Sequence, residues 1–249
     1  MEVSSTGVVA GSLDDAEEAE RAGMGMTGPT GHSRTPATPV GKRPRWVVGG
    51  TTILTFVALL YLVELIDQLS GGRLDRNGIR PLTTDGLWGI VFAPVLHANW
   101  QHLIANTIPM LVLGFLMTLA GLARFVWATA IVWILGGFGT WLIGNVGSSC
   151  GPTDHIGASG LIFGWLAFLV VFGFFVRRLR DIVIGLVVLF VYGGVLWGAL
   201  PVLGRCGGVS WQGHLCGALA GVVAAYLLSA PERKARERKK SPRSLPRTL

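Results

Sequence analysis

Charged residues and cysteines are scarce in this sequence. Only 14% of its 249 residues are charged, whereas soluble globular domains carry about 25%. Its three cysteines, Cys150, Cys206 and Cys216, form no Cys-x-x-Cys pair and share no ligand spacing with histidine. The low charge argues against a soluble domain, and the cysteine spacing predicts neither a metal site nor a bound cofactor.

Long apolar runs make up most of the chain instead. Hydrophobic residues account for 51% of it, and its mean hydropathy is +0.55. A run of about 20 apolar residues crosses a bilayer as a helix. Such runs cover residues 46–66, 103–123, 125–145, 159–176, 182–203 and 211–229. We therefore expect an all-α integral membrane protein with a six-helix membrane domain over 42–229. Residues 1–41 hold too little apolar surface for a core, which predicts a disordered tail.

The positions of the basic residues predict how the six runs are oriented. Lys and Arg precede the first run, separate the second from the third and the fourth from the fifth, and fill the tail 230–249. Cytoplasmic loops are rich in these residues, so we expect a multi-pass plasma-membrane protein with both termini in the cytoplasm. The tail suits anionic lipid headgroups better than nucleic acid, because no soluble domain is left to bind nucleic acid. Glu64 and Asp67 end the first run at the outer interface, where acids are tolerated.

A serine and a histidine share one membrane depth in this topology. Ser159 begins the fourth run and His214 begins the sixth, both near the expected outer face. Polar residues in membrane spans mark functional sites, and serine with histidine is the minimal pair for nucleophilic acyl transfer. His102 and Asn106 lie four residues apart on one face of the second run. They either tie two helices together or donate hydrogen bonds to an oxyanion.

Glycines recur at every fourth position in two of the runs. They are Gly213, Gly217 and Gly221 in the sixth run, and Gly160 and Gly164 in the fourth. Small residues at this spacing let helix backbones approach closely in lipid. If the two glycine faces pack together, Ser159 and His214 come within hydrogen-bond reach; the alternative is that a glycine face serves dimerisation.

Three motifs together resemble the rhomboid family of intramembrane serine proteases. They are His97-x4-His102-x3-Asn106 in the second run, Gly157-Ala158-Ser159-Gly160 at the start of the fourth, and Gly213-His214-x2-Gly217-x3-Gly221 in the sixth. The resemblance covers residues 46–229. It implies a six-helix bundle with a water-filled cavity open to the outside, and an endopeptidase that cleaves transmembrane protein substrates with a Ser–His dyad.

The resemblance also implies a role for each residue of the site. Ser159 matches the nucleophile of the family, and His214 matches the general base. His102, Asn106 and the backbone N–H of Ser159 match the groups that stabilise the oxyanion. The family uses no aspartate as a third member.

Supporting positions follow the family with some departures. Phe163 stands where an aromatic residue, often tyrosine, packs against the base, so the ring is kept and the hydroxyl is lost. Gly157 and Gly160 flank the serine, and His97 matches a histidine with a structural role. The first outer loop, 67–101, lacks the adjacent Trp–Arg pair of many rhomboids, which leaves its conformation open.

Two other functions are compatible with a membrane helix bundle. A catalytically silent rhomboid-like protein would bind transmembrane clients without cutting them, although such relatives usually lack the serine or the histidine. A small transporter often contains repeats, but no repeat relates the two halves of this chain. Its high Gly, Ala and Arg usage is typical of a GC-rich bacterial genome.

The loops of the expected outer face contain further reactive side chains. Asp154 and His155 precede the serine motif, and we expect them to be solvated rather than to complete a catalytic triad. Cys150 and Cys206 lie in different outer loops, so an oxidising exterior would permit a disulfide between them.

Overall fold

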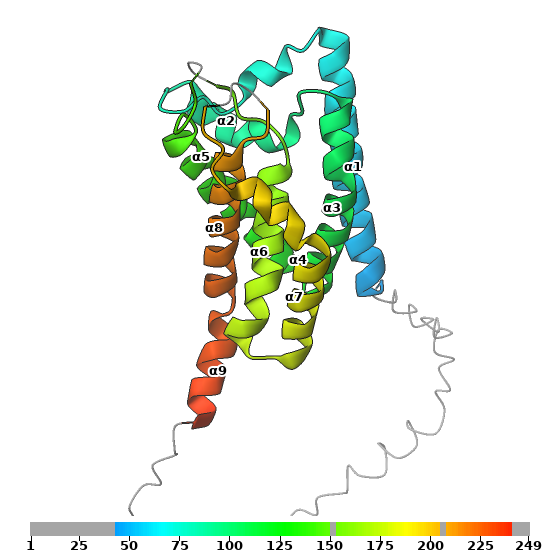
Figure 1. The fold of residues 1–249 in the computed structure, drawn as a ribbon. Coiled ribbons are helices and arrows are strands. Elements are labelled where there is room, and N and C mark those ends of the chain that lie inside the picture. The colour runs from blue at the N-terminus through cyan, green and yellow to red at the C-terminus, as the bar shows by residue number, and fades with distance from the viewer. Residues whose placement is uncertain (1–42, 150–152, 205–207, 241–249) are drawn as a thin grey trace, which may run out of the picture. The chain divides into compact units, whose positions relative to one another are not determined.

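Six helices of the described chain are long and apolar enough to cross a membrane. The computed structural model describes residues 43–149, 153–204 and 208–240. The six spans are Arg45–Ser70, Trp100–Leu119, Leu122–Ile143, Ser159–Val176, Leu179–Ala199 and Trp211–Lys239. The predicted six-helix architecture is confirmed (Figure 1). The predicted tail 1–41 and the cysteines Cys150 and Cys206 lie outside the described residues.

Several spans combine more than one helical segment. The four long helices are α1 (Arg45–Ser70), α3 (Trp100–Leu119), α6 (Ser159–Val176) and α8 (Trp211–Leu228). The third span joins α4 (Leu122–Ile131), the π-helical η4 (Val132–Gly136) and α5 (Gly137–Ile143). The fifth joins α7 (Leu179–Tyr192) to the 3-10 helix η5 (Gly193–Ala199). Between α1 and α3 lie the short helices η2 (Leu74–Asn77), α2 (Gly86–Phe92) and η3 (Ala93–Val95), and α8 is followed by α9 (Ala230–Lys240).

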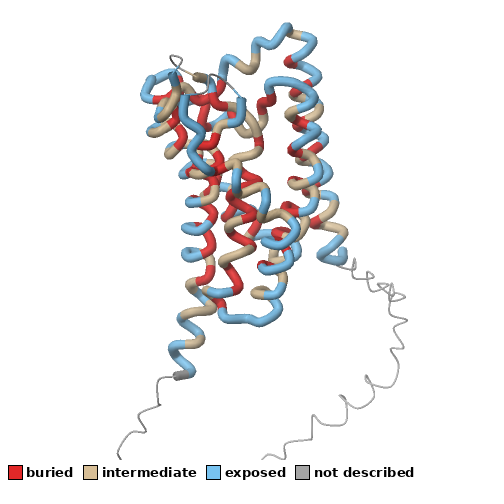
Figure 2. The backbone as a smooth tube through the Cα atoms, in the orientation of Figure 1, coloured by how far each residue is buried: buried red, intermediate tan, exposed pale blue. Residues whose placement is uncertain are grey.

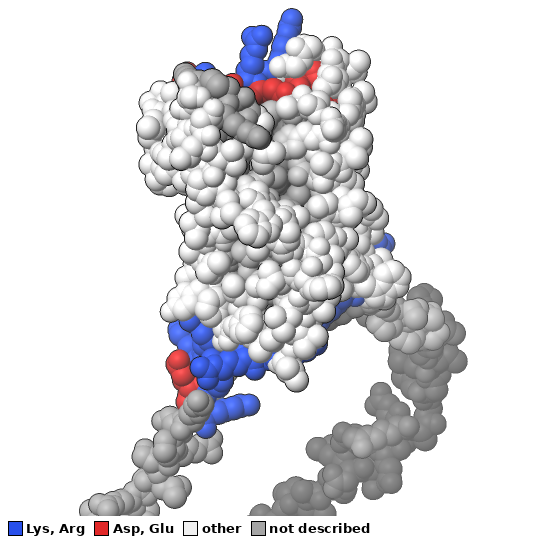
Figure 3. All heavy atoms as spheres, in the orientation of Figure 1, with Lys and Arg blue, Asp and Glu red and all other residues white. Residues whose placement is uncertain are grey.

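The bundle has two ends of different character. The end that carries α2 and the first turns of α3, α6 and α8 is called the loop end below; the end that carries the α6–α7 turn and α9 is called the basic end. Figure 3 shows Lys and Arg side chains gathered at the basic end and fewer at the loop end. On the face that Figure 3 shows, the surface between the two ends is almost free of charge, which suits contact with lipid.

Helix α6 lies at the centre of the bundle. It contacts α3, α4, α7 and α8, and Trp165 and Phe168 near its middle are fully buried. A helix that is apolar on every side is stable only when it is surrounded, by protein or by lipid. Figure 2 shows the contrast with α7, which is mostly exposed and carries Phe190 at 91% exposure. Ser159, the first residue of α6, therefore begins a helix that other helices surround.

Glycines bring the backbones of α6 and α8 into contact, as the sequence predicted. A Cβ atom at Gly217 would clash with the carbonyl of Gly160, and one at Gly221 would clash with the carbonyl of Gly164. Carbonyl groups of a helix backbone cannot rotate out of the way, so only glycine fits at these positions. The two predicted glycine faces thus pack against each other within one chain.

Two tryptophans fix the segment between α1 and α3. Trp133 Nε1 donates to the Ile90 carbonyl at 2.8 Å, and Trp141 Nε1 donates to the Thr83 carbonyl at 2.8 Å. The Trp141 carbonyl in turn accepts from Leu82 N–H at 3.1 Å. The sequence left the conformation of this loop open, because the Trp–Arg pair is missing. Tryptophans of the third span hold it instead.

Three acids gather where α1 meets η2. Glu64 and Asp67, which were predicted near the outer interface, are each 1% exposed, because the loop that follows α1 covers them. Asp67 Oδ1 accepts from Leu74 N–H at 2.6 Å. Burial and the charges of Asp67 and Glu64 raise the pKa of Asp75 to about 6. This carboxyl group therefore takes up a proton in mildly acidic solution.

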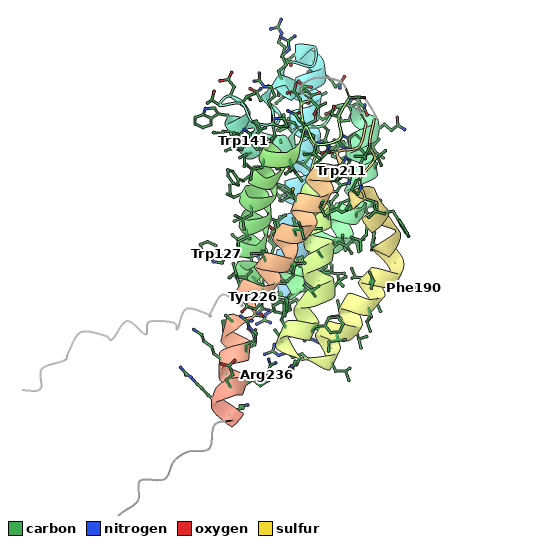
Figure 4. The ribbon with its side chains drawn as sticks, turned by 60° about the vertical axis from the view of Figure 1, so that its left-hand side comes forward. Trp127, Trp141, Phe190, Trp211, Tyr226 and Arg236 are labelled. Carbon is green, nitrogen blue, oxygen red and sulfur yellow. The ribbon has the colours of Figure 1, made fainter. Side chains whose placement is uncertain are left out.

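Helix α9 is attached to the basic end by charged side chains. Arg124 Nη2 lies 2.6 Å from Glu232 Oε1. Arg236 Nη1, whose side chain is labelled in Figure 4, donates to the Val176 carbonyl at 2.9 Å. Arginine at a helix C-terminus satisfies carbonyls that have no partner within the helix. Residues 230–240 of the predicted basic tail are therefore an ordered continuation of α8.

We expect Gly221→Ala to destabilise the bundle and Gly50→Ala to leave it intact. The alanine methyl at position 221 must push α6 and α8 apart, and overpacking of this kind costs about 1–3 kcal/mol. A Cβ at Gly50 would meet only Phe115 at 3.9 Å, and alanine is the better helix former. Equilibrium unfolding in mixed detergent micelles, followed by circular dichroism, measures both variants. Equal stability of the two would contradict the close packing of α6 on α8.

Candidate active site

Ser159 and His214 meet at the loop end. Ser159 is the first residue of α6, and His214 lies in the first turn of α8, whose start is marked by Trp211 in Figure 4. The distance from His214 Nε2 to Ser159 Oγ is 2.8 Å. The structure therefore brings together the two residues that were predicted to form a dyad.

The imidazole of His214 is held on its other side by η5 and α6. Its Nδ1 lies 3.0 Å from the carbonyl oxygen of Gly198. A carbonyl only accepts hydrogen bonds, so Nδ1 carries the hydrogen and Nε2 is left to accept from the serine hydroxyl. The ring of Phe163 stacks on the imidazole at 4.0 Å between centroids and an angle of 13°. A Cβ at Gly198 would lie 3.2 Å from both rings, so the missing side chain lets the carbonyl approach.

His102 and Asn106 line the same cavity as the serine and the histidine. This cavity at the loop end measures about 880 Å³. The ring of His102 lies close to Gly157, where a Cβ would come within 2.9 Å of Nε2 and where φ is +120°. The side chain of Asn106 is 7% exposed, and its Nδ2 has no hydrogen-bond partner among the described residues. A buried donor without a partner is costly, and the residue that carries this one lines the cavity.

His97 supports the loop that leads to the serine. Its Nε2 accepts from Ala158 N–H at 3.4 Å, and its ring meets that of His102 edge to face at 5.2 Å. The side chain is 1% exposed. Burial, followed by the nearby His102, lowers the pKa of His97 to about 4. His97 is therefore neutral at physiological pH, as an acceptor for a backbone N–H must be.

The prediction that His155 is solvated is wrong, while Asp154 is exposed as expected. His155 is 8% exposed, because its backbone pairs with Ile79 of the first loop and draws the ring under that loop. Its Nδ1 lies 2.7 Å from Ser210 Oγ. Asp154 faces outward and lies 3.7 Å from Arg80.

Two features of the site were not identified in the sequence: the Gly198 carbonyl and the link between His155 and Ser210. Gly198 is one of 36 glycines, and nothing in its neighbourhood marks it as the partner of a histidine. The link between His155 and Ser210 joins two loops that are 55 residues apart. Only Ser210 carried a usable signal, since a serine before an apolar run is typical of a helix N-cap. Its Oγ does accept from Gly213 N–H.

Comparison with known proteins identifies a family match and several close relatives that are described as uncharacterized. The profile of the Rhomboid domain matches residues 84–231. Uncharacterized proteins of Mycobacterium tuberculosis and Mycobacterium bovis are 84% identical over 216 residues, covering 87% of this chain and 90% of theirs. A putative rhomboid protein of Acanthamoeba polyphaga mimivirus is 30% identical over 136 residues, covering 55% of this chain and 72% of its own length.

The buried His97 predicts a loss of stability in acid. Its pKa is lowered from 6.5 to about 4 by folding, so the unfolded chain binds the extra proton first. The contribution of His97 to the free energy of unfolding is therefore fully present above pH 6.5. It is lost as the pH drops toward 4, by up to about 3 kcal/mol. His97→Gln keeps an acceptor but cannot be charged, so its stability should fall less over this range. Unfolding in micelles at pH 7.5, 5.5 and 4.5 measures the difference, and parallel pH curves would contradict it.

Proposed function

The chain belongs to the rhomboid family, and we propose that it is an intramembrane serine endopeptidase that cleaves transmembrane protein substrates at the loop end of its bundle. The observation that carries the proposal is the 2.8 Å hydrogen bond between Ser159 Oγ and His214 Nε2 inside a cavity. A hydroxyl is a weak nucleophile until a neighbouring base takes its proton. This pair lies where a substrate helix reaches the edge of the membrane.

The proposed reaction begins with the transfer of a proton. His214 Nε2 takes the hydroxyl proton while Ser159 Oγ attacks the carbonyl carbon of the scissile peptide bond. The imidazolium that forms keeps its Nδ1–H on the Gly198 carbonyl and its face on Phe163. It then protonates the leaving amine, and the peptide bond breaks. A water molecule attacks the resulting ester, with His214 again taking and returning the proton.

The oxyanion of the tetrahedral intermediate needs donors that are already in place. Asn106 Nδ2 is a buried donor without a partner among the described residues, and His102 lines the same cavity. The N–H of Ser159 belongs to the first residue of α6, so the helix itself offers it no carbonyl. Donors fixed before the reaction stabilise developing charge without reorganising, which suits this role.

The difference between the two ends supports the proposed membrane orientation. α1 begins and α9 ends at the basic end (Figure 1), and loops rich in Lys and Arg stay in the cytoplasm. Both termini are therefore cytoplasmic, and the loop end faces the outside of a bacterial plasma membrane. Substrates are membrane-anchored proteins whose helix unwinds at the outer face.

Loss of the dyad should abolish cleavage. We expect Ser159→Ala and His214→Ala each to reduce kcat for a transmembrane reporter in liposomes by at least about 10³-fold, because the two residues act as a unit. Ser70→Ala at the same end of the bundle, where the hydroxyl donates to the Asp67 carbonyl, serves as the control. Cleavage that persists in Ser159→Ala would overturn the proposal. A fluorophosphonate probe separates a protease from a silent relative, since only an activated serine is labelled.

Removal of an oxyanion donor should lower kcat more than it changes KM. Asn106→Ala takes away one donor, and loss of such a donor costs about 10²–10³-fold in kcat. Thr107→Val, one residue further on, removes a hydroxyl that lies 3.1 Å from Tyr61 Oη on a different side of α3, and should leave kcat within a few-fold. Steady-state kinetics on the liposome reporter distinguishes the two. An unchanged kcat in Asn106→Ala would remove this residue from the site.

A further inference from the structure

A second serine–histidine hydrogen bond lies next to the proposed dyad. His155 Nδ1 and Ser210 Oγ are 2.7 Å apart. His155 precedes Ser159 by four residues, and Ser210 precedes His214 by four residues. The two hydrogen bonds and the two short segments therefore form a closed ring. One side of the ring leads into α6, and the other leads into α8.

Hydrogen-bond chemistry assigns each group in this second pair. Ser210 is the N-cap of α8, and its Oγ accepts from Gly213 N–H at 3.0 Å. The backbone of Gly144, close to His155 Nε2, accepts from the ring. Nε2 therefore carries the hydrogen, with Thr153 Oγ1 also 3.1 Å away, and Nδ1 accepts from the Ser210 hydroxyl. This scheme requires a neutral imidazole. Burial lowers the pKa of His155 and favours the neutral form; the charge of Asp154, which is exposed and lies 3.7 Å from Arg80, acts in the opposite direction and is the smaller effect.

The ring of His155 is itself held in place from the first loop. Ile79 N–H donates to the His155 carbonyl at 2.9 Å, and His155 N–H donates to the Ile79 carbonyl at 3.0 Å. On the side of α5, a Cβ at Gly144 would come within 2.6 Å of the ring, so glycine leaves the space that the imidazole occupies. Backbone pairing and shape thus fix one end of the link to Ser210.

We infer that His155 is a positioning residue for the proposed dyad: through Ser210 it holds the first turn of α8 so that His214 reaches Ser159. The inference rests on the proposed function. What distinguishes Ser210 from Ser159 is that its oxygen caps α8 by accepting from Gly213 N–H at 3.0 Å, which suits a structural role. The hydrogen bond between His155 and Ser210 thus ties the loop that precedes Ser159 to α8, the helix that carries His214.

The experiment uses a double-mutant cycle on the full chain in liposomes. His155→Leu removes the link, Ser210→Ala removes it from the other side, and the double variant removes both partners. His155→Asn keeps an acceptor atom at the position of Nδ1, and Ser210→Thr keeps the hydroxyl. Asp154→Asn, on the neighbouring exposed side chain, is the matched control. The readouts are kcat, KM, the rate of fluorophosphonate labelling of Ser159, and the melting temperature in micelles.

The expected rates follow from a displacement of His214 relative to Ser159. Displacements near 1 Å cost up to about 10²-fold in rate, so kcat and the labelling rate should fall roughly 10- to 100-fold in His155→Leu and in Ser210→Ala, with KM nearly unchanged. The double variant should be no slower than the slower single variant. His155→Asn and Ser210→Thr should recover most of the rate, and Asp154→Asn should match the wild type.

The outcomes distinguish a failure of the proposed function from a failure of the inference about His155. Wild-type protein that neither cuts nor labels would overturn the proposed function and the inference with it. An active wild type with unaffected His155→Leu would overturn the inference alone. Losses of rate that multiply in the double variant would also overturn the inference, because the two side chains would then act independently. So would an equal loss of rate in His155→Asn and His155→Leu at unchanged melting temperature, because the effect would then not depend on the hydrogen bond.

Discussion

The contact between the backbones of α6 and α8 is the constraint on which the rest of the site depends. Gly217 and Gly221 leave no atoms between the two helices except those of the main chain. A serine hydroxyl is short, so a histidine on a neighbouring helix reaches it only when the helices lie this close. The same contact sets the relative height of Ser159 and His214, because the glycines interlock with successive turns of α6. Packing in lipid gains little from apolar burial between helices, which makes this close fit more important than it would be in water.

The site is built from neutral groups, which suits a region of low dielectric constant. His214 is oriented by a backbone carbonyl and an aromatic face rather than by a carboxylate. A buried carboxylate there would need its own compensating partners, and Gly198 avoids that cost. Among the described residues, no acid forms a hydrogen bond with His214, and Asp154, which lines the same cavity, is exposed and lies 3.7 Å from Arg80. On the proposed function, charge develops during the reaction on the imidazole of His214 and on the oxyanion that His102 and Asn106 would stabilise.

The sequence predicted the features that repeat along a helix and missed those that depend on irregular backbone. Hydropathy located the six spans, and four-residue spacing located the faces that pack together. The shared depth of Ser159 and His214 followed from topology alone. By contrast, the Gly198 carbonyl points at the histidine because η5 tightens to a 3-10 helix, and no periodic pattern encodes that. The burial of His155 depends on a backbone pair with Ile79, 76 residues earlier, which only the folded chain brings about.

Helix α6 also relates the site to the thickness of the membrane. It has 18 residues and begins at Ser159, so its axis extends about 27 Å from that serine to the basic end, close to the roughly 30 Å of a hydrocarbon core. On the proposed function, the length of α6 sets the distance between the cytoplasmic boundary and the site of cleavage. A peptide bond is selected by its height above the cytoplasmic boundary, and moving a substrate helix by one turn would shift the cut by about four residues. Bilayer thickness would then be a determinant of cleavage position in its own right.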